Sequence, residues 1–574
     1  MSRNVKRYFV YLKEYKWYCI LGAASKWIEA VLELLVPLVM ANIIDIGITE
    51  RGSIGYVLAG GGVMLAMGAV GFGCALFCQR SASIASQGFG TNVRNALFRH
   101  INTLSYRELD KIGTASLVTR TTNDVNQMQS AVAMIIRLVV RAPFIAAGAV
   151  VLCFVIDWQI GLLVTGISVL VGLVLWVIMH KTVPYYAKNQ KKLDRLTQIT
   201  NENLEGARVV RAFSRREGER ERFDGAAEDM LDNSLKIGRI SAWLNPLTYA
   251  IVNFGVALIL AFCDFKVHTP AGFTSGDIVA LINYMAQILN AMIVISNLIS
   301  LFTKAYASMN RVSEVMDMKS SIAETGDAQA DFSQPAVEMD GVSFSYAGTE
   351  QYSLSDVSLS IPRGATVGVI GGTGSGKSTL VNLMPRLYDA SCGRVKIFGK
   401  DVKEYRMHEL RQLFGVVPQS ATLFSGTVRS NLRWGKQDAT DDEMNEALKT
   451  ACAYDFIMGK GGLDQPVTEA GKNFSGGQRQ RLTIARAVVG KPAILILDDS
   501  CSALDFATDA KVRKNISELK DLTTIIISQR ASSIKNADVI YVMEDGKIAG
   551  SGKHAQLYEN CPLYREICDS QTRA

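Results

Sequence analysis

The sequence carries little charge of either sign and no obvious cysteine framework. Charged residues make up 20% of the 574-residue chain, and the net charge of +7 is too small to indicate a nucleic-acid partner. Ten cysteines are scattered without a CxxC pair or a Cys/His cluster, so we expect reduced, structural thiols rather than a disulfide scaffold or a metal centre. With 48% apolar residues, the composition also excludes a disordered or collagen-like chain.

The sequence also lacks a convincing small-residue cleavage site for a signal peptide. Its first apolar stretch begins too late and runs too long for a cleavable signal, so we predict a retained membrane span. A spanning helix needs about 20 mostly apolar residues. Six stretches meet this length, at 17–44, 54–78, 133–156, 158–180, 240–263 and 275–302. We therefore expect a polytopic α-helical membrane domain over residues 1–316.

Basic residues beside the spans predict the orientation of the chain. Lys and Arg are frequent in the leader and in segments 79–132 and 181–239, whereas the loop at 45–53 holds only Arg51 and the loop at 264–274 only Lys266. Because basic segments stay in the cytoplasm, both termini are predicted to be cytoplasmic. In a bacterial host the membrane would be the cell membrane.

The two long basic segments continue the neighbouring spans with a helical pattern. Residues 92–101 place apolar side chains at i, i+3, i+4 and i+7. We expect helical hairpins that extend far into the cytoplasm, with reversals near Tyr106–Gly113 and Phe213–Glu219. A separate cytosolic inserted domain is the alternative, since loops of this length are usually structured or functional.

The composition of the chain changes after Met316. Residues 317–335 are mostly small and polar and include Pro and Gly, which is typical of a linker. From 336 to 574, β-rich runs alternate with helical patterns. The runs predicted to be buried strands are 366–370, 493–497, 523–527 and 539–543. This alternation predicts an α/β nucleotide-binding domain with a largely parallel sheet.

The strongest motif directly follows the first of these strands. It fits the pattern GxxxxGKS between a strand and a helix. The predicted phosphate loop consists of Gly371, Gly372, Thr373, Gly374, Ser375, Gly376, Lys377, Ser378 and Thr379. Its glycines let backbone N–H groups converge on phosphate oxygens, and the helix N-terminus adds its dipole. Lys377 is expected to reach the β- and γ-phosphates and the Ser378 hydroxyl to ligate Mg²⁺, so the motif predicts ATP and Mg²⁺ as cofactors.

Further motifs accompany the phosphate loop. The apolar strand at 494–497 ends in Asp498 and Asp499, and Asp498 suits the Walker B role of holding Mg²⁺ through water. The run Phe-Ser-Gly-Gly-Gln-Arg-Gln-Arg at 474–481 resembles the signature motif of ATP-binding cassette (ABC) proteins. Other matches to this family are Asp505 in a D-loop, Gln419 in a Q-loop, and Tyr346 as the aromatic residue that stacks on adenine.

The six-span layout with a C-terminal cassette resembles ABC exporter half-transporters over essentially the full chain. This resemblance implies a transport ATPase whose α/β P-loop ABC nucleotide-binding domain covers 336–574. The nucleotide contacts that it implies beyond the phosphate loop are Tyr346, Ser475, Gly476, Gly477, Gln478 and Asp505. The Mg²⁺ ligands that it implies are Ser378, Gln419 and Asp498. Residues 209–215 also resemble the family's second coupling region.

Two of the three implied catalytic positions, Gln419, Asp499 and Gln529, depart from the family's pattern. Asp499 stands where the family has its catalytic glutamate, and Gln529 where it has its switch histidine. The shorter aspartate withdraws its carboxylate by about 1.5 Å, and a misplaced general base forfeits about 10²–10⁴-fold in rate. Glutamine can donate to a γ-phosphate but is neither a cation nor a proton shuttle. We therefore predict a site that binds ATP and hydrolyses it poorly.

The signature motif, in contrast, matches the family well. Because ABC cassettes pair head to tail, this signature would complete a competent site on a second half-transporter, while the chain's own Walker motifs form a degenerate site. The resemblance thus implies a heterodimer. A homodimer with two slow sites is the alternative.

Charged residues within the first span bear on the substrate. Lys26, Glu29 and Glu33 lie on neighbouring turns of one helix. Charges at this depth rarely face lipid, so Glu29 and Glu33 either line a cavity that attracts cationic amphiphiles or are paired internally. We expect export of a small amphiphilic molecule (a drug, lipid or peptide). An importer of a chelated metal on the same fold, and a regulator or channel that does not pump, remain alternatives.

Overall fold

The structure is a computed structural model that describes residues 7–267, 274–323, 326–346, 349, 351–500 and 503–572. The chain divides into two compact units. The first comprises Met1–Asn102 and Ala115–Asp317, and the second comprises Thr103–Thr114 and Met318–Ala574. A short stretch between the second and third spans therefore packs with the C-terminal part of the chain.

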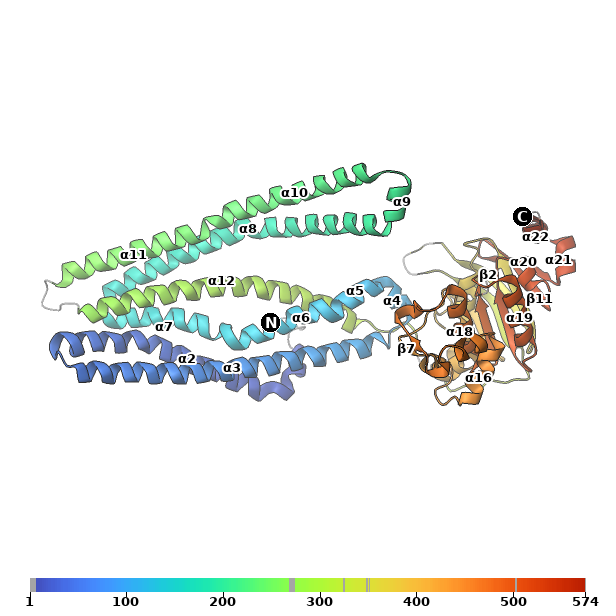
Figure 1. The fold of residues 1–574 in the computed structure, drawn as a ribbon, viewed down its shortest axis with the longest axis horizontal. Coiled ribbons are helices and arrows are strands. Elements are labelled where there is room, and N and C mark those ends of the chain that lie inside the picture. Colours follow the sequence, from blue (N-terminus) through green and yellow to red (C-terminus); the bar gives the residue numbers. More distant parts are fainter. Residues whose placement is uncertain are drawn as a thin grey trace. The chain divides into compact units, whose positions relative to one another are not determined.

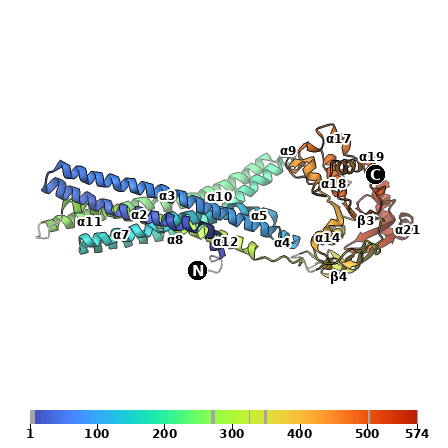
Figure 2. The same ribbon diagram turned by 90° about the horizontal axis from the view of Figure 1, so that it is seen from below.

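Within the described residues, six helices of the first unit are long and apolar enough to span a membrane, as the sequence predicts (Figures 1 and 2). They run Phe9–Glu50, Ile54–Ile101, Thr114–Ile156, Trp158–Glu205, Arg216–Cys263 and Ser275–Asp317. Each is longer than the apolar stretch that predicted it, because polar residues continue the helix beyond its apolar part.

Several of these spanning helices consist of more than one element. The first combines η1 (Phe9–Tyr15), α2 (Lys16–Asn42) and η2 (Ile43–Glu50), and the second is α3 (Ile54–Ile101). The third combines α5 (Thr114–Thr119), η3 (Arg120–Asp124), α6 (Val125–Met134), η4 (Ile135–Val139) and α7 (Arg141–Ile156). The remaining elements are α8 (Trp158–Glu205), α9 (Ala207–Ala212), α10 (Arg216–Ala242), α11 (Leu244–Val267) and α12 (Ser275–Asp317).

Some apolar side chains of the first unit are buried between its helices, and others are exposed. A buried cluster joins α2, α7 and α12 through residues that include Leu34, Ile145 and Tyr284. In contrast, α3 leaves large apolar side chains exposed, with Leu58 at 70% and Leu65 at 78%. Extended apolar surface on a helix of spanning length is what contact with lipid requires.

The basic segment 181–239 forms a helical hairpin, so the alternative of a separate inserted domain is wrong for this segment. In Figure 1, α8 continues beyond its apolar part, α9 turns the chain, and α10 returns alongside α8. An ion pair between Arg222 Nη2 and Glu202 Oε2, 2.9 Å apart, joins the two long helices. The reversal predicted near Phe213–Glu219 lies slightly earlier, because α10 already begins at Arg216.

The second unit is built on a mostly parallel sheet, as predicted. Within the described part of the chain its six strands follow the order β12-β11-β3-β10-β9-β6. Only the edge strand β12 is antiparallel to its neighbour. A smaller antiparallel sheet has the order β2-β1-β4-β5.

The strands of the larger sheet are β3 (Thr366–Gly371), β6 (Phe414–Val417), β9 (Ile494–Asp498), β10 (Thr523–Ile527), β11 (Val539–Glu544) and β12 (Lys547–Gly552). Those of the smaller sheet are β1 (Val337–Phe344), β2 (Leu354–Ile361), β4 (Cys392–Ile397) and β5 (Lys400–Asp401). The short strands β7 (Gly426–Thr427) and β8 (Pro466–Val467) pair with each other.

The second unit also contains helices. They are α4 (Tyr106–Ile112), α13 (Lys377–Leu383), α14 (Met407–Gln412), α15 (Val428–Leu432), α16 (Asp441–Thr450), α17 (Tyr454–Met458), α18 (Gly476–Val488), α19 (Phe506–Ser517), α20 (Ala531–Ile534), α21 (His554–Asn560) and α22 (Pro562–Thr572).

The central strands are mostly apolar because both faces of the sheet are buried. In β9, Ile496 packs into one hydrophobic cluster, whereas Leu495 and Leu497 pack into another. In β10, Ile525 packs into the same cluster as Ile496, and Ile526 packs into the same cluster as Leu495 and Leu497. Strands covered on both faces read as continuous apolar runs, which is the pattern that predicted them.

Candidate nucleotide-binding site

The register of the parallel sheet brings three loops to one edge. Ile527 near the end of β10 pairs with Val369 of β3 on one side and with Asp498 of β9 on the other. The loops that follow β3, β9 and β10 therefore emerge side by side. In open α/β sheets this carboxyl edge is where ligands bind.

The phosphate loop after β3 requires glycine at defined positions. Gly374 and Gly376 have φ angles of +84° and +93°, a region that other residues rarely adopt. At Gly376, an added Cβ would lie 2.6 Å from the Ser353 carbonyl oxygen. Gly376 is also the N-cap of α13, whose first residue is Lys377. The loop thus ends on the N-terminus of a helix, where backbone N–H groups and the helix dipole favour an anion.

The ammonium group of Lys377 lies against this loop. Its Nζ donates to the carbonyl oxygens of Gly371 and Gly372 at 2.9 and 2.6 Å, and to Ser375 Oγ at 3.2 Å. Burial lowers the pKa of Lys377, while the carboxylates of Asp499 and Asp498 act in the opposite direction. A buried cation among exchangeable carbonyl acceptors is suited to binding a phosphate.

Oxygen ligands for a divalent cation meet beside Lys377. Ser378 Oγ donates to Asp498 Oδ1 at 3.1 Å, which brings together the hydroxyl and the carboxylate expected to bind Mg²⁺. Burial raises the pKa of Asp498, and the neighbouring Asp499 raises it further. Gln419 lines the same cavity. This set of hard oxygen ligands fits Mg²⁺, which takes one or two carboxylates together with phosphate oxygens.

A cavity of about 1130 Å³ unites most of the predicted nucleotide contacts. The predicted residues that line it are Tyr346, Thr373, Gly374, Gly376, Lys377, Ser378, Thr379, Gln419, Asp498, Asp499 and Gln529. Gly371, Gly372 and Ser375 belong to the loop but do not line the cavity. Thr349, Gln351, Tyr352 and Asp545 also line the cavity, although the sequence analysis did not select them. These four residues carry no motif, so only their position in the fold reveals them.

The two departures from the family pattern both lie at this cavity. Asp499 directly follows β9 with a φ of 44°, and its N–H donates to the Ile527 carbonyl oxygen at 3.0 Å. Burial raises the pKa of Asp499, against opposing hydrogen bonds and charges that include the Gln529 backbone. The Gln529 carbonyl oxygen in turn accepts from Gln571 Nε2 at 2.6 Å.

The signature and D-loop residues that the structure describes do not line the cavity of their own chain. Ser475 caps α18: its Oγ accepts from the Gln478 N–H at 3.3 Å, and its N–H donates to Gln478 Oε1 at 3.0 Å. Gly476 is exposed, and a Cβ added there would meet nothing within 4 Å, whereas Gly477 lies against the Ala503 carbonyl oxygen. Asp505 caps α19 by accepting from the Thr508 N–H at 3.0 Å, a bond that lowers the pKa of Asp505.

Glu29 and Glu33 of the first span both have basic partners. Lys26 Nζ lies 2.7 Å from each carboxylate oxygen of Glu29. Arg141 Nη2 donates to both carboxylate oxygens of Glu33, at 2.8 and 2.6 Å. This arrangement agrees with the alternative that Glu29 and Glu33 are paired internally. A role of Glu29 and Glu33 in a substrate cavity stays a prediction.

A glycine-rich loop between a strand and a helix, beside a strand that ends in acids, defines a P-loop nucleotide-binding domain. Joined to six helices of spanning length, it defines an integral, multi-pass transport ATPase. The sequence matches the ABC transporter transmembrane region over residues 19–292 and the ABC transporter domain over residues 354–502. The chain belongs to the ABC transporters, as a half-transporter of the exporter type.

Two relatives and one solved structure illustrate this membership. An uncharacterized ABC transporter ATP-binding protein of Mycobacterium tuberculosis is 36% identical over 555 residues, which cover 95% of this chain and 94% of the relative. The ATP-dependent lipid A-core flippase of Chromobacterium violaceum is 31% identical, with 98% and 96% of the two chains covered. The structure of a bacterial Atm1-family ABC exporter with ATP bound matches with a TM-score of 0.77 at 24% identity, over 99% of both chains, so the chain has that fold.

Proposed function

We propose that this half-transporter exports small amphiphilic molecules by binding and hydrolysing ATP with Mg²⁺, as the degenerate-site subunit of a heterodimer. The observation that carries the proposal is the composition of the cavity. It combines a complete phosphate loop with Asp499 and Gln529 at the positions of the family's glutamate and histidine. Export of an amphiphile is supported by the resemblance to a lipid flippase and to an exporter fold.

Each group of the nucleotide has a counterpart in the cavity. Tyr346 would stack on adenine, Lys377 would bind the β- and γ-phosphates, and Ser378, Gln419 and Asp498 would hold Mg²⁺. Bound Mg²⁺ would neutralise charge on the phosphate oxygens. The carboxylate of Asp499 is then one methylene short of the position from which a glutamate would orient water, so hydrolysis here is slow.

The signature residues support the second half of the proposal. Ser475 and Gly476 are exposed at the start of α18 and do not line their own chain's cavity. A head-to-tail partner could therefore use them to complete its own site, with Asp505 close to that contact. On this basis a heterodimer has one competent site, to which this chain contributes its signature. The basic segments described above support cytoplasmic termini.

The proposal is tested on the purified chain without any partner. We expect it to bind MgATP but to hydrolyse it slowly. The double variant Asp499→Glu/Gln529→His should raise the rate by about 10²-fold or more, because a self-paired chain already has intact signature residues. The matched variant Gly476→Asp in that background should abolish the gain. Vigorous hydrolysis by the unaltered chain, or no gain from the double variant, would contradict the degenerate-site assignment.

A second experiment separates the heterodimer from a homodimer. The tagged chain is purified from its native membrane, and the co-purifying half-transporter is identified by mass spectrometry. In that complex Gly476→Asp should abolish most ATP hydrolysis at saturating ATP and Mg²⁺, whereas Asp499→Asn should reduce it only slightly. Equal losses would mean two equivalent sites.

A further inference from the structure

The side-chain amide of Gln571 binds the backbone segment that carries Gln529. Gln571 lies near the C-terminal end of α22, and its Nε2 donates to the Gln529 carbonyl oxygen at 2.6 Å. Its Oε1 accepts from the Ala531 N–H at 2.8 Å. Only this orientation of the amide satisfies both partners, because a carbonyl oxygen accepts and an N–H donates. Both ends of the Gln571 amide are therefore used to hold residues 529–531.

The same segment is also held from the side of the larger sheet. The Ser528 N–H donates to a carbonyl oxygen of β3 at 3.1 Å, and the Arg530 N–H donates to Ser528 Oγ at 2.9 Å. The Gln529 N–H hydrogen-bonds to the carboxylate of Asp499. Gln571 adds a restraint from a part of the chain that is 42 residues away in sequence. Since the Gln529 side chain lines the cavity, these bonds determine the point from which it extends.

Packing of α22 against α20 brings Gln571 to this segment (Figure 1). Tyr564, Cys568 and Gln571 are spaced at i, i+4 and i+7 and so share one face of α22. On this face Tyr564 is 0% exposed, and both Tyr564 and Cys568 belong to the hydrophobic cluster that contains Ala531 and Ile534 of α20. A side chain carried by a packed helix holds its partner more precisely than one carried by a loop.

We propose that Gln571 is a positioning residue that holds the backbone of Gln529 so that the Gln529 side chain faces the γ-phosphate of bound ATP. A glutamine carries no charge, so its attraction for a phosphate depends on one hydrogen bond, and such a bond weakens steeply with poor alignment. The inference rests on the proposed ATP site. It goes beyond that proposal because it assigns a role at the γ-phosphate to the C-terminal helix.

Equilibrium binding to the purified full chain in detergent tests this role. The two ligands are a non-hydrolysable ATP analogue and ADP, each with Mg²⁺, and each displaces a fluorescent ATP analogue. Because only the triphosphate has a γ-phosphate, Gln571→Ala should weaken its binding about three- to tenfold, part of the value of a hydrogen bond to a charged group, and leave ADP binding unchanged. Gln529→Ala should cause at least the same selective loss. The double variant should bind no worse than Gln529→Ala, since both changes act through one side chain.

Two further variants control for general loss of a glutamine and for misfolding. Gln556 is another exposed glutamine near the C-terminus, and its Oε1 accepts from the Lys553 N–H at 3.1 Å. Gln556→Ala should leave the binding of both nucleotides unchanged. Gln571→Glu keeps an acceptor for the Ala531 N–H but removes the donor to Gln529. It should therefore show the same selective loss, even if Gln571→Ala does not fold.

The outcomes separate this proposal from the proposed function. An unchanged preference for the triphosphate in folded Gln571→Ala, or in Gln571→Glu if Gln571→Ala does not fold, would overturn the positioning role. Equal weakening of both nucleotides, no selective loss in Gln529→Ala, or a further loss in the double variant would also overturn it. In each of these cases the ATP site stands. Failure of the unaltered chain to bind either nucleotide would instead refute the ATP site.

Discussion

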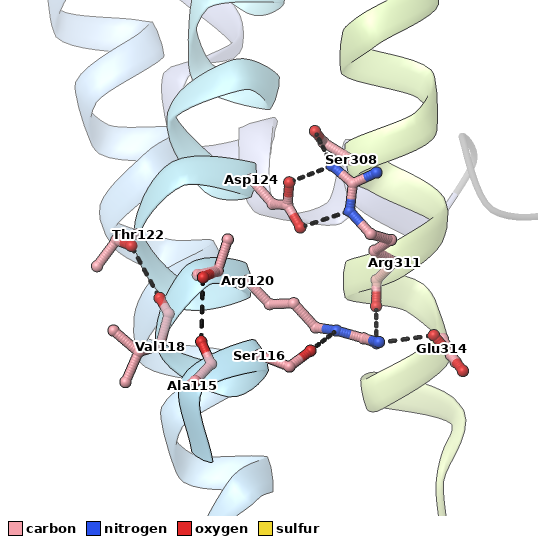
Figure 3. A network of polar contacts seen from close by, with 10 residues as sticks. Ala115, Ser116, Val118, Arg120, Thr122, Asp124, Ser308, Arg311 and Glu314 are labelled. Carbon is pink, nitrogen blue, oxygen red and sulfur yellow. Dashed lines mark hydrogen bonds and ion pairs between the residues drawn. The ribbon is translucent and has the colours of Figure 1, made fainter. Parts of the chain in front are cut away.

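An ion pair between the third and sixth spanning helices joins two partners of very different burial. Figure 3 shows Arg311 of α12 reaching Asp124 at the end of η3, where Arg311 Nε lies 2.9 Å from Asp124 Oδ2 and Nη2 contacts Oδ1. The Asp124 side chain is 1% exposed, whereas that of Arg311 is 49% exposed. A second pair, Arg120 with Glu314 at 2.8 Å, lies beside the first.

The unequal burial predicts unequal effects of removing each partner. Arg311→Met leaves the carboxylate of Asp124 buried without its cation, which we expect to cost about 3 kcal/mol of stability, the lower end for a broken buried pair. Asp124→Asn leaves a neutral amide in the buried position and a guanidinium that is already half in water. We expect that change to cost about 1 kcal/mol, the size of one lost hydrogen bond. The double variant should therefore be more stable than Arg311→Met alone.

Thermal stability of the purified chain in detergent measures this order. Each variant is heated and the surviving folded fraction is determined by size-exclusion chromatography, which ranks the variants without requiring reversible unfolding. Arg222→Met provides the matched control. Its ion pair with Glu202 has a similar length of 2.9 Å, but both side chains are nearly half exposed, so its loss should be small.

The result that would refute this reasoning is a reversed or flat order. If Asp124→Asn lowers stability as much as Arg311→Met, burial of the carboxylate is not what makes the pair costly to break. If Arg222→Met is equally destabilising, the effect belongs to any arginine on these helices. In either case the asymmetry of exposure would carry no energetic meaning.

Three other outcomes are expected from the same kind of argument. Burial raises the pKa of Asp498, so the stabilising contribution of this residue is present below its unfolded pKa and is lost as the pH rises through its folded pKa. Asp498→Asn should therefore raise the melting temperature of the nucleotide-free protein at pH 7. This gain should shrink toward about pH 4. Lys377→Ala should remove most MgATP binding, measured by titration with a fluorescent ATP analogue, because it deletes the buried cation of the phosphate loop. Glu33→Gln should lower folded yield and the transport of cationic and neutral dyes alike, since it leaves Arg141 without its carboxylate; selective loss of cationic dyes in vesicles would favour a cavity role.

Features that depend on neighbouring residues in the sequence could be predicted closely. The runs at 493–497 and 523–527 agree with β9 and β10 to within one residue, because strands buried on both faces are apolar without interruption. The phosphate loop could also be predicted from the sequence, because its glycines and Lys377 lie close together in the chain and lead directly into α13. The membrane spans were recognised in number, and their ends at residues 54, 156, 158, 263 and 275 agree with the structure, whereas the opposite ends of these helices extend well beyond the predicted ones. Beyond the bilayer nothing requires an apolar run, and α10 has a sequence rich in charged residues.

Contacts between distant segments could not be predicted in this way. The pairing of Glu33 with Arg141 depends on how α2 and α7 are packed, and neither residue indicates the other in the sequence. The cavity residues Thr349 and Tyr352 lie in a loop without a recognisable motif. The segment that carries Tyr352 approaches the phosphate loop, since the Ser353 carbonyl oxygen would lie 2.6 Å from a Cβ added at Gly376.

The difference between Asp499 and Tyr352 shows why some cavity residues could be predicted from the sequence and others could not. Asp499 follows a buried strand by one residue, and parallel pairing fixes where such strand ends meet, so its place at the cavity could be inferred before the structure was known. Tyr352 also lines this cavity but stands in no motif, so nothing in the sequence distinguishes it from other tyrosines. Residues at the ends of buried parallel strands are therefore found from local pattern, whereas cavity residues such as Tyr352 have to be found from packing.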